Sequence, residues 1–219
     1  DNIIKKRSPY SKLNMSQPHV MGVINITPDS FYKKSQKSDY NSVKMIFEKM
    51  ETYGASIIDI GAESTKPNAD FTSEEEEWNR LYPLLKKLSK ENLGQTKISI
   101  DTRRPSIMRK SIDLGVHYIN HIVTSPLDHS TIQLLKKTNT VYIATHISKT
   151  PKDMQSTPLK KKEALSNVEA FFSNYYNALT KQGLSPQNIF FDPGIGFEKT
   201  DSANLHLMQH TQQFAHQYN

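Results

Sequence analysis

The chain of 219 residues has a length typical of one domain, or at most two small ones, and its 28 Lys and Arg against 22 Asp and Glu give a net charge of +6. It has no cysteine, which excludes a disulfide framework, a thiolate zinc site and a cysteine nucleophile. The basic pairs are scattered along the chain, so we expect no nucleic-acid partner, whereas an anionic small substrate fits the charge. Because no apolar run approaches the roughly 18 residues that span a membrane, we expect a soluble, cytoplasmic protein without a membrane partner.

Short β-branched apolar runs alternate with helical patterns along the chain, which predicts a parallel α/β protein. The predicted strands are Val20–Ile24, Ile57–Ile60, Ile98–Ile100, Val116–Ile119, Val141–Ala144 and Ile189–Phe191. The predicted helices are Ser42–Tyr53, Ser73–Leu88, Pro105–Leu114, Ser130–Lys137 and Lys162–Lys181. Ser73 and Glu76 form a capping box, and Gly54, Gly115 and Gly183 stand where helix ends favour positive φ. An open doubly wound sheet and a (β/α)8 barrel both fit this pattern.

Polar side chains lie at the carboxyl ends of the predicted strands, where ligands bind in both architectures. They are Asn25, Asp59, Glu63, Asp101, Asn120, Thr145, His146 and Asp192. No Gly-x-Gly-x-x-Gly follows a strand and no P-loop motif is present, which excludes the ordinary dinucleotide and P-loop sites. These polar residues therefore predict a ligand site of another kind at the strand ends.

Four segments, in chain order, resemble the dihydropteroate synthase family of the folate pathway. They are residues 21–31 (MGVINITPDSF), 58–67 (IDIGAESTKP), 98–102 (ISIDT) and 192–197 (DPGIGF), within a likeness that runs from about Pro18 to Asn219. The resemblance implies the (β/α)8 barrel, here as a single pterin-binding domain over residues 1–219 with residues 1–17 as an N-terminal arm. It also implies the family's reaction, in which 6-hydroxymethyl-7,8-dihydropterin diphosphate condenses with p-aminobenzoate to give 7,8-dihydropteroate and diphosphate. Sulfonamides, which mimic p-aminobenzoate, would inhibit it.

The resemblance also implies roles for individual residues. Asp101, Asn120 and Asp192 would bind the amino-pyrimidinone edge of the pterin, and Asp101 and Asp192 would stabilise a cation in a dissociative mechanism. Asn25 would help to hold Mg²⁺. The residues expected at the diphosphate are Thr65, Lys66 and His146, and those expected in the loops over p-aminobenzoate are Thr27, Pro28, Phe31 and Pro67. Outside the resemblance, a strand-end Asp or Asn is most often a cap or turn former, and a lone His such as His146 is most often a structural hydrogen-bonding group.

The chain departs from the family pattern at several of these positions. Lys66 stands where the family has Arg, Asn68 where it has Gly, His121 where it has Asp, Thr145 where it has Met, and Glu198 where it has Gly. The first loop continues as residues 32–35 (YKKS) without the family's glycines, which removes positive-φ conformations.

Strands seven and eight of the barrel, with the family's Ser-x-Lys and Arg-x-His motifs, are absent from the 219 residues, so about six of the eight βα units are present. We expect the sequence to be a piece of a longer enzyme. The alternatives are a chain that pairs with a second copy and a degenerate, non-catalytic pterin-binding or interaction protein. A methyltetrahydrofolate methyltransferase domain is disfavoured because residues 25–31 lack its Asn-x-Gly-Glu-Arg-Thr turn. The family resemblance also suggests a homodimer.

Overall fold

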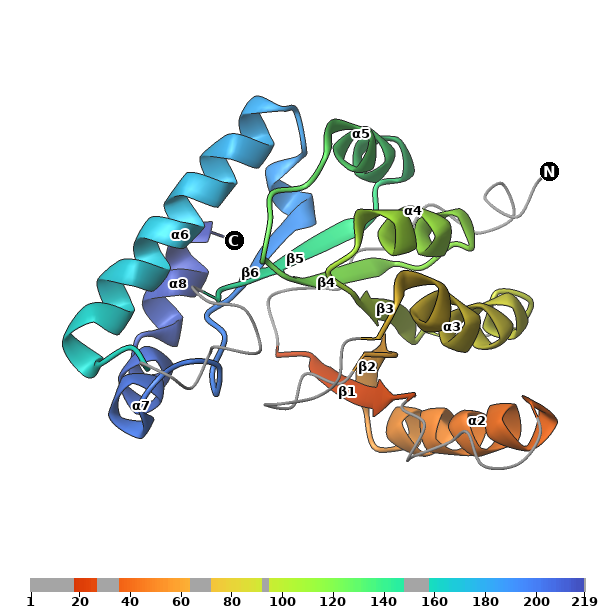
Figure 1. Cartoon of the computed structure of the whole chain (residues 1–219). Coiled ribbons are helices and arrows are strands. Elements are labelled where there is room, and N and C mark those ends of the chain that lie inside the picture. Colours follow the sequence, from red (N-terminus) through yellow and green to blue (C-terminus); the bar gives the residue numbers. More distant parts are fainter. Residues whose placement is uncertain (1–17, 27–35, 64–71, 92–94, 148–157, 219) are drawn as a thin grey trace. The chain divides into compact units, whose positions relative to one another are not determined.

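The computed structural model describes residues 18–26, 36–63, 72–91, 95–147 and 158–218 (Figure 1). These residues contain six strands that alternate with helices, as the sequence predicts. The chain divides into two compact units, and each is described by itself below. Among the described residues, unit 1 comprises 18–26, 36–63, 72–91 and 95–119, and unit 2 comprises 120–147 and 158–218.

Unit 1 contains three neighbouring parallel strands, β1 (Val20–Asn25), β2 (Ala55–Gly61) and β3 (Lys97–Asp101). Helices α2 (Gln36–Thr52), α3 (Glu74–Leu88) and α4 (Pro105–Asp113) follow these strands in turn (Figure 1). The apolar side chains of the central strand β2 are buried, as a strand covered on both faces requires. The register pairs Asn25 with Gly61 and Gly61 with Asp101, so these three residues form a row at the carboxyl ends of the strands.

Helix α3 begins as its sequence signature predicts. The Ser73 side chain accepts a hydrogen bond from the Glu76 backbone N–H at 3.1 Å. Four glutamates occupy the first turn and two lysines the last turn, which suits the direction of the helix dipole. Two charged residues of this helix, Glu77 and Arg80, are buried, and both belong to the polar cluster described in the next subsection.

Unit 2 contains the parallel pair β5 (Val141–Thr145) and β6 (Ile189–Asp192). Strand β4 (Tyr118–Ile122) crosses the boundary between the units, and its last three residues belong to unit 2. Its helices are α5 (His129–Thr138), α6 (Lys161–Lys181), α7 (Asp201–Gln209) and α8 (Thr211–Tyr218), with a short 3₁₀ helix, η2 (Pro186–Asn188), before β6.

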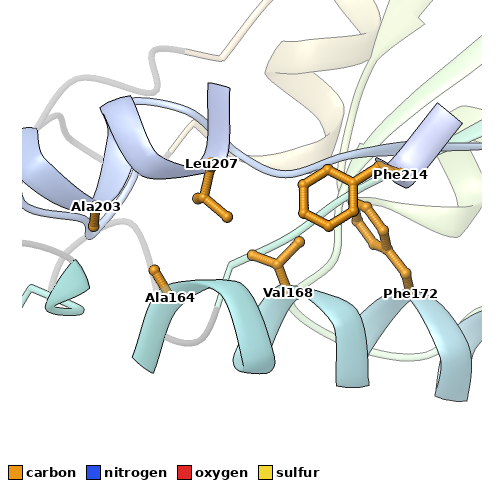
Figure 2. Packing of buried hydrophobic residues seen from close by; sticks show 6 residues of the cluster. All are labelled: Ala164, Val168, Phe172, Ala203, Leu207 and Phe214. Atoms are coloured by element: carbon orange, nitrogen blue, oxygen red, sulfur yellow. The ribbon is translucent and has the colours of Figure 1, made fainter. Parts of the chain in front are cut away.

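An apolar cluster joins α6 to α7 and α8, as Figure 2 shows. Its buried members are Ala164, Val168, Phe172, Ala203, Leu207 and Phe214. The rings of Phe172 and Phe214 meet edge to face with centroids 5.2 Å apart. This packing accounts for a C-terminal helix pair that strand and cap patterns did not predict.

The element boundaries differ from the predicted ones in a few places. Helix α2 begins at Gln36 rather than Ser42, and α5 begins after Asp128, whose side chain accepts from the Thr131 N–H at 2.7 Å. Strand β4 continues to Ile122, beyond the predicted end at Ile119, because tertiary contacts accommodate polar residues within it. His121 is buried there, with Nδ1 2.6 Å from the Tyr142 hydroxyl. The predicted positive φ at the glycines after α2, α4 and α6 is confirmed.

Candidate functional site

In unit 1, two of the predicted site residues lie on either side of a glycine. A Cβ placed on Gly61 would lie 3.1 Å from Asn25 Oδ1 and 3.6 Å from Asp101 Oδ2. The missing side chain thus leaves room for the Asn25 amide and the Asp101 carboxylate at the ends of β1 and β3. Asn25 is exposed and Asp101 half-buried, so both can reach a ligand.

Asp101 stands among other carboxylates. Burial raises its pKa well above the ordinary value, and the negative charges of Asp59, Glu77 and Glu63 raise the pKa further. Asp59 is itself almost completely buried, at 3% exposure. A carboxyl group in this setting gains strongly from a ligand that brings positive charge or hydrogen-bond donors.

Arginines of the β3–α4 connection neutralise part of this negative charge. Arg103 binds Glu63 through both ends of its guanidinium group, at 2.9 and 3.0 Å. Arg104 binds Glu63 at 3.2 Å and also binds the buried Glu77. Burial lowers the pKa of Arg104, but the carboxylates of Glu77 and Glu63 outweigh this effect and raise the pKa overall.

Two arginines also bind groups on both sides of residues 64–71, one backbone carbonyl and one side chain each. Arg80 donates to the Ala62 carbonyl at 2.8 Å and lies 3.4 Å from the Thr72 hydroxyl. Arg104 binds Glu63 on the near side of that segment and the Thr72 carbonyl on the far side. Each arginine therefore connects the two chain segments at the ends of β2 and the start of α3.

Some predicted residues lie outside the described part of the chain. For the diphosphate set these are Thr65 and Lys66, and for the p-aminobenzoate set they are Thr27, Pro28, Phe31 and Pro67. Their roles stay predictions.

In unit 2, Thr145 at the end of β5 lies next to two other predicted site residues. The strand register pairs Thr145 with Asp192 of β6. The Thr145 hydroxyl donates to Asn120 Oδ1 of β4 at 3.3 Å. The Asn120 amide of β4 and the Asp192 carboxylate of β6 thus lie on either side of Thr145 of β5, although Asn120 lies within its strand and not at the end that the sequence analysis predicted.

Backbone groups fix the orientation of Asp192. The Gly194 N–H donates to Asp192 Oδ1 at 2.7 Å, and the His146 N–H donates to the Asp192 carbonyl at 2.9 Å. Gly194 has a φ of +67°, and a Cβ there would overlap the His146 carbonyl oxygen. Only glycine fits this turn, which presents the carboxylate as a fixed acceptor.

The His146 side chain is buried, at 2% exposure, and Nε2 lies 2.9 Å from the side-chain oxygen of Asn167 on α6. Nδ1 lies 4.0 Å from Glu198 Oε1. Burial lowers the pKa of His146, and the positive charge of Lys199 lowers it further. A neutral, buried imidazole fits the structural alternative for this residue, and its contact with diphosphate stays a prediction.

Sequence reasoning did not select several charged residues that the fold places in these clusters. They are Glu77, Arg80, Arg103, Arg104 and Lys199. Arg103 and Arg104 come two and three residues after the strand-end Asp101, and that position was the available signal. It was missed because scattered basic pairs are most often solvated.

This chain is similar to known proteins over most of its length. The family model described as pterin binding enzyme matches residues 21–219. The dihydropteroate synthase of Escherichia coli K12 is 32% identical over 206 residues, which cover 94% of this chain and 72% of that protein. The dihydropteroate synthase of Haemophilus influenzae is 34% identical over 202 residues, which cover 92% of this chain and 72% of that protein. This chain belongs to the dihydropteroate synthase family.

Solved structures of the family share the fold. The Yersinia pestis dihydropteroate synthase in complex with a sulfonamide drug superposes with a TM-score of 0.78 at 29% identity, covering 94% of this chain and 73% of that one. The Xanthomonas albilineans dihydropteroate synthase with 4-aminobenzoic acid superposes with a TM-score of 0.79 at 26% identity, covering 94% and 71%. The predicted barrel architecture, with its last units outside the sequence, is confirmed. The predicted function is confirmed as well, and the reaction class is transfer of a pterinylmethyl group.

Among the helices that the structure describes, none is both long enough and apolar enough to cross a bilayer.

Proposed function

We propose that this chain binds the pterin of 6-hydroxymethyl-7,8-dihydropterin diphosphate through Asp101, Asn120 and Asp192. The observation that carries the proposal is the row formed by Asn120, Thr145 and Asp192. The Thr145 hydroxyl donates to the Asn120 amide oxygen, which fixes the direction of this side chain. On the other side of Thr145, Asp192 supplies an acceptor whose Oδ1 is held by the Gly194 N–H. An amino-pyrimidinone edge alternates donors and acceptors, so an oriented amide and a fixed carboxylate in one row suit it.

The reaction exchanges a carbon–oxygen bond for a carbon–nitrogen bond. The bond between the methylene carbon and the diphosphate oxygen breaks, and the leaving diphosphate keeps the electron pair. Positive charge builds up on the methylene carbon, and the amino nitrogen of p-aminobenzoate forms the new bond and then loses a proton. The carboxylates of Asp101 and Asp192 stabilise this charge electrostatically, and no covalent enzyme intermediate is required.

The surroundings of Asp101 fit this role. Its raised pKa reflects a surplus of nearby negative charge, and a pterin that develops positive charge would offset that surplus. Binding of the pterin should therefore lower the pKa of Asp101. The same carboxylates that raise the pKa of Asp101 would favour the charged transition state.

We also propose that Asn25 helps to hold Mg²⁺. Its amide oxygen is a hard ligand, its side chain is exposed, and Gly61 leaves the space beside it open. An ion that retains most of its waters needs few protein ligands, so one amide oxygen at this strand end fits. When bound, Mg²⁺ would neutralise charge on the leaving diphosphate.

Further parts of the proposal rest on the family resemblance. Contact of His146, Thr65 and Lys66 with diphosphate, and of Thr27, Pro28, Phe31 and Pro67 with p-aminobenzoate, are predictions. A single domain over residues 1–219, a homodimer and a cytoplasmic location are predictions too.

Isothermal titration of the 219-residue chain with the pterin diphosphate in Mg²⁺ tests the assignment. Asp101→Asn, Asn120→Ala and Asp192→Asn should each weaken binding about tenfold or more, because each removes a charged or directional hydrogen bond. Asp113→Asn, an exposed change on α4, is the matched control and should leave affinity unchanged. Equal affinity of the site variants and the control would contradict the assignment.

Two further readouts separate the parts of the proposal. Asn25→Ala should reduce the gain in affinity that Mg²⁺ gives while leaving pterin affinity without Mg²⁺ unchanged. Formation of 7,8-dihydropteroate from both substrates distinguishes a synthase from a chain that binds pterin without catalysis.

A further inference from the structure

The turn after β6 is held by a buried lysine. Lys199 has only 7% of its surface exposed, and its ammonium group donates to the carbonyls of Gly194 at 2.9 Å and Phe197 at 3.1 Å. The Phe197 N–H also donates to the Gly194 carbonyl, at 3.1 Å. Two donors thus converge on one carbonyl oxygen and restrain the peptide between Gly194 and Ile195.

The N–H of the same residue, Gly194, holds Asp192. The Gly194 N–H donates to Asp192 Oδ1, on the opposite side of the same residue from the carbonyl that binds Lys199. The Phe197 side chain packs against Ile122 and Ile147, which anchors the far end of the turn in apolar contacts. A movement of the Lys199 ammonium would therefore be transmitted to the Asp192 carboxylate through a short, packed segment.

The residue before this lysine carries a carboxylate that interacts electrostatically with the ammonium group. Glu198 is 1% exposed and has a φ of +42°, a conformation that side chains other than glycine rarely adopt. The Leu159 N–H donates to the Glu198 carbonyl at 2.6 Å and keeps the backbone in place. At this position the family resemblance leads one to expect glycine, so the strained, buried glutamate calls for a compensating interaction.

The electrostatics supply that interaction. Burial lowers the pKa of Lys199 to about 8, and the negative charges of Glu198 and Asp192 act in the opposite direction. His146 is the other titratable group that responds to Lys199, and burial together with this lysine keeps its pKa low, so it is neutral near pH 7. Glu198 and Asp192 therefore provide the negative charge beside a cation that would otherwise be buried alone.

We propose that Lys199 is a positioning residue for pterin recognition: by bonding to the Gly194 and Phe197 carbonyls it fixes the Asp192 carboxylate, with Glu198 as its buried counter-charge. This proposal rests on the assignment of Asp192 to the pterin made above. Lys199 does not contact the substrate in this scheme and acts through Gly194.

The test measures the rigidity of the turn and the affinity for the ligand separately. Amide exchange of Gly194, followed by NMR in the ligand-free 219-residue chain, reports the hydrogen bond to Asp192. Lys199→Met should speed this exchange about tenfold or more, because it removes charged hydrogen bonds that restrain the peptide. Amides of the core strand β2 should not change, and Lys162→Met, an exposed change on α6, should leave both unchanged.

Titration with 6-hydroxymethyl-7,8-dihydropterin diphosphate supplies the second readout. Lys199→Met should weaken binding about tenfold at pH 7. Glu198→Gln keeps the size of the side chain and serves as the second variant if Lys199→Met does not fold. It should weaken binding less at pH 7 and increasingly as the pH rises toward 8, because Lys199 then loses its proton at a lower pH than in the parent chain.

The outcomes distinguish this proposal from the one on which it rests. The positioning role is overturned if the Gly194 amide exchanges as slowly in Lys199→Met as in the parent chain. The same holds if exchange in Glu198→Gln at pH 8 equals that of the parent chain. Weaker binding in Asp192→Asn without any change in Lys199→Met overturns it as well, while the assignment of Asp192 stands. If Asp192→Asn and Lys199→Met both bind as tightly as the parent chain, although Gly194 exchange is faster in Lys199→Met, the assignment of Asp192 is contradicted. The basis for a role of Lys199 in recognition is then removed.

Discussion

Each unit has a carboxylate at the end of a parallel strand, but the surroundings of the two carboxylates differ. In unit 1, Asp101 has other carboxylates around it, and arginines bind those neighbours. In unit 2, the Asp192 side chain accepts a hydrogen bond from the Gly194 N–H, and a buried lysine binds the carbonyl of the same glycine. Asp101 is left with a raised pKa and a need for positive charge, whereas Asp192 is fixed in direction by its own turn.

The two units therefore differ in the kind of energetic cost that they carry. Unit 1 concentrates electrostatic cost, since like charges lie together and two buried charged residues, Glu77 and Arg80, depend on their partners. Unit 2 concentrates conformational cost, with left-handed backbone at Gly194, Gly196 and Glu198 around one buried cation. Mutations in the two units should therefore fail for different reasons.

The largest effect is expected where a buried ion pair is broken in unit 1. Arg104→Met should lower the free energy of unfolding by about 3–5 kcal/mol, because it leaves Glu77 buried without this cation. Chemical denaturation would measure the loss. Lys110→Met is the control on the same helix, since its ion pair with Glu74 is exposed and its removal should cost less than about 0.5 kcal/mol. Equal losses would show that the cluster in unit 1 is no more than a solvated surface.

The turn of unit 2 gives the next largest effect. Gly194→Ala should cost about 2–3 kcal/mol and strongly weaken pterin diphosphate binding, because the new Cβ would overlap the His146 carbonyl oxygen at a positive φ. Gly196→Ala shares the positive φ but has open space around it, so it should cost only about 1 kcal/mol. Comparing the two denaturation curves separates overlap from backbone strain, and similar losses would contradict the tight turn.

A change of opposite sign is expected at Asp101. The pKa of Asp101 is higher in the folded chain than in the unfolded chain. Between these two pKa values the folded chain binds more protons than the unfolded chain, so the free energy of unfolding falls as the pH rises through this range. Asp101→Asn removes this cost and should raise the free energy of unfolding at pH 7 on the order of 1 kcal/mol, with little gain below pH 4. Asp192→Asn should give no such gain. A destabilised Asp101→Asn at pH 7 would contradict the surplus of negative charge in unit 1.

The smallest effect concerns the hydroxyl that orients Asn120. Thr145→Val keeps the shape of the side chain and removes the hydrogen bond to Asn120 Oδ1, so pterin diphosphate should bind about three- to fivefold more weakly. Thr145→Ser retains the hydroxyl and should bind within about twofold of the parent chain. Titration calorimetry of the three proteins would detect the difference, and identical affinities would show that Asn120 is oriented by other contacts.

Residues that interact locally were predictable from the sequence, and residues that interact across the fold were not. The strand ends at Asn25, Asp101 and Asp192 could be located because apolar runs stop there and polar residues follow. Strand β4 was placed too early because Asn120 and His121 interrupt its apolar run, and the bond from His121 to Tyr142 exists only once β5 is in place. The arginines that bind both sides of residues 64–71 were overlooked for the same reason.

By itself, the sequence determined the alternation of strands and helices, the cap of α3, the family and the identity of the strand-end polar residues. These depend on periodicity and on neighbours a few positions apart in the chain. Three features depend on the tertiary structure: carboxylates surround Asp101, Arg104 binds Glu77, and Lys199 is buried against the turn that holds Asp192. Each of these depends on burial and on the electrostatic field of neighbouring groups, many of them distant in the chain, and both quantities are set only when the chain has folded.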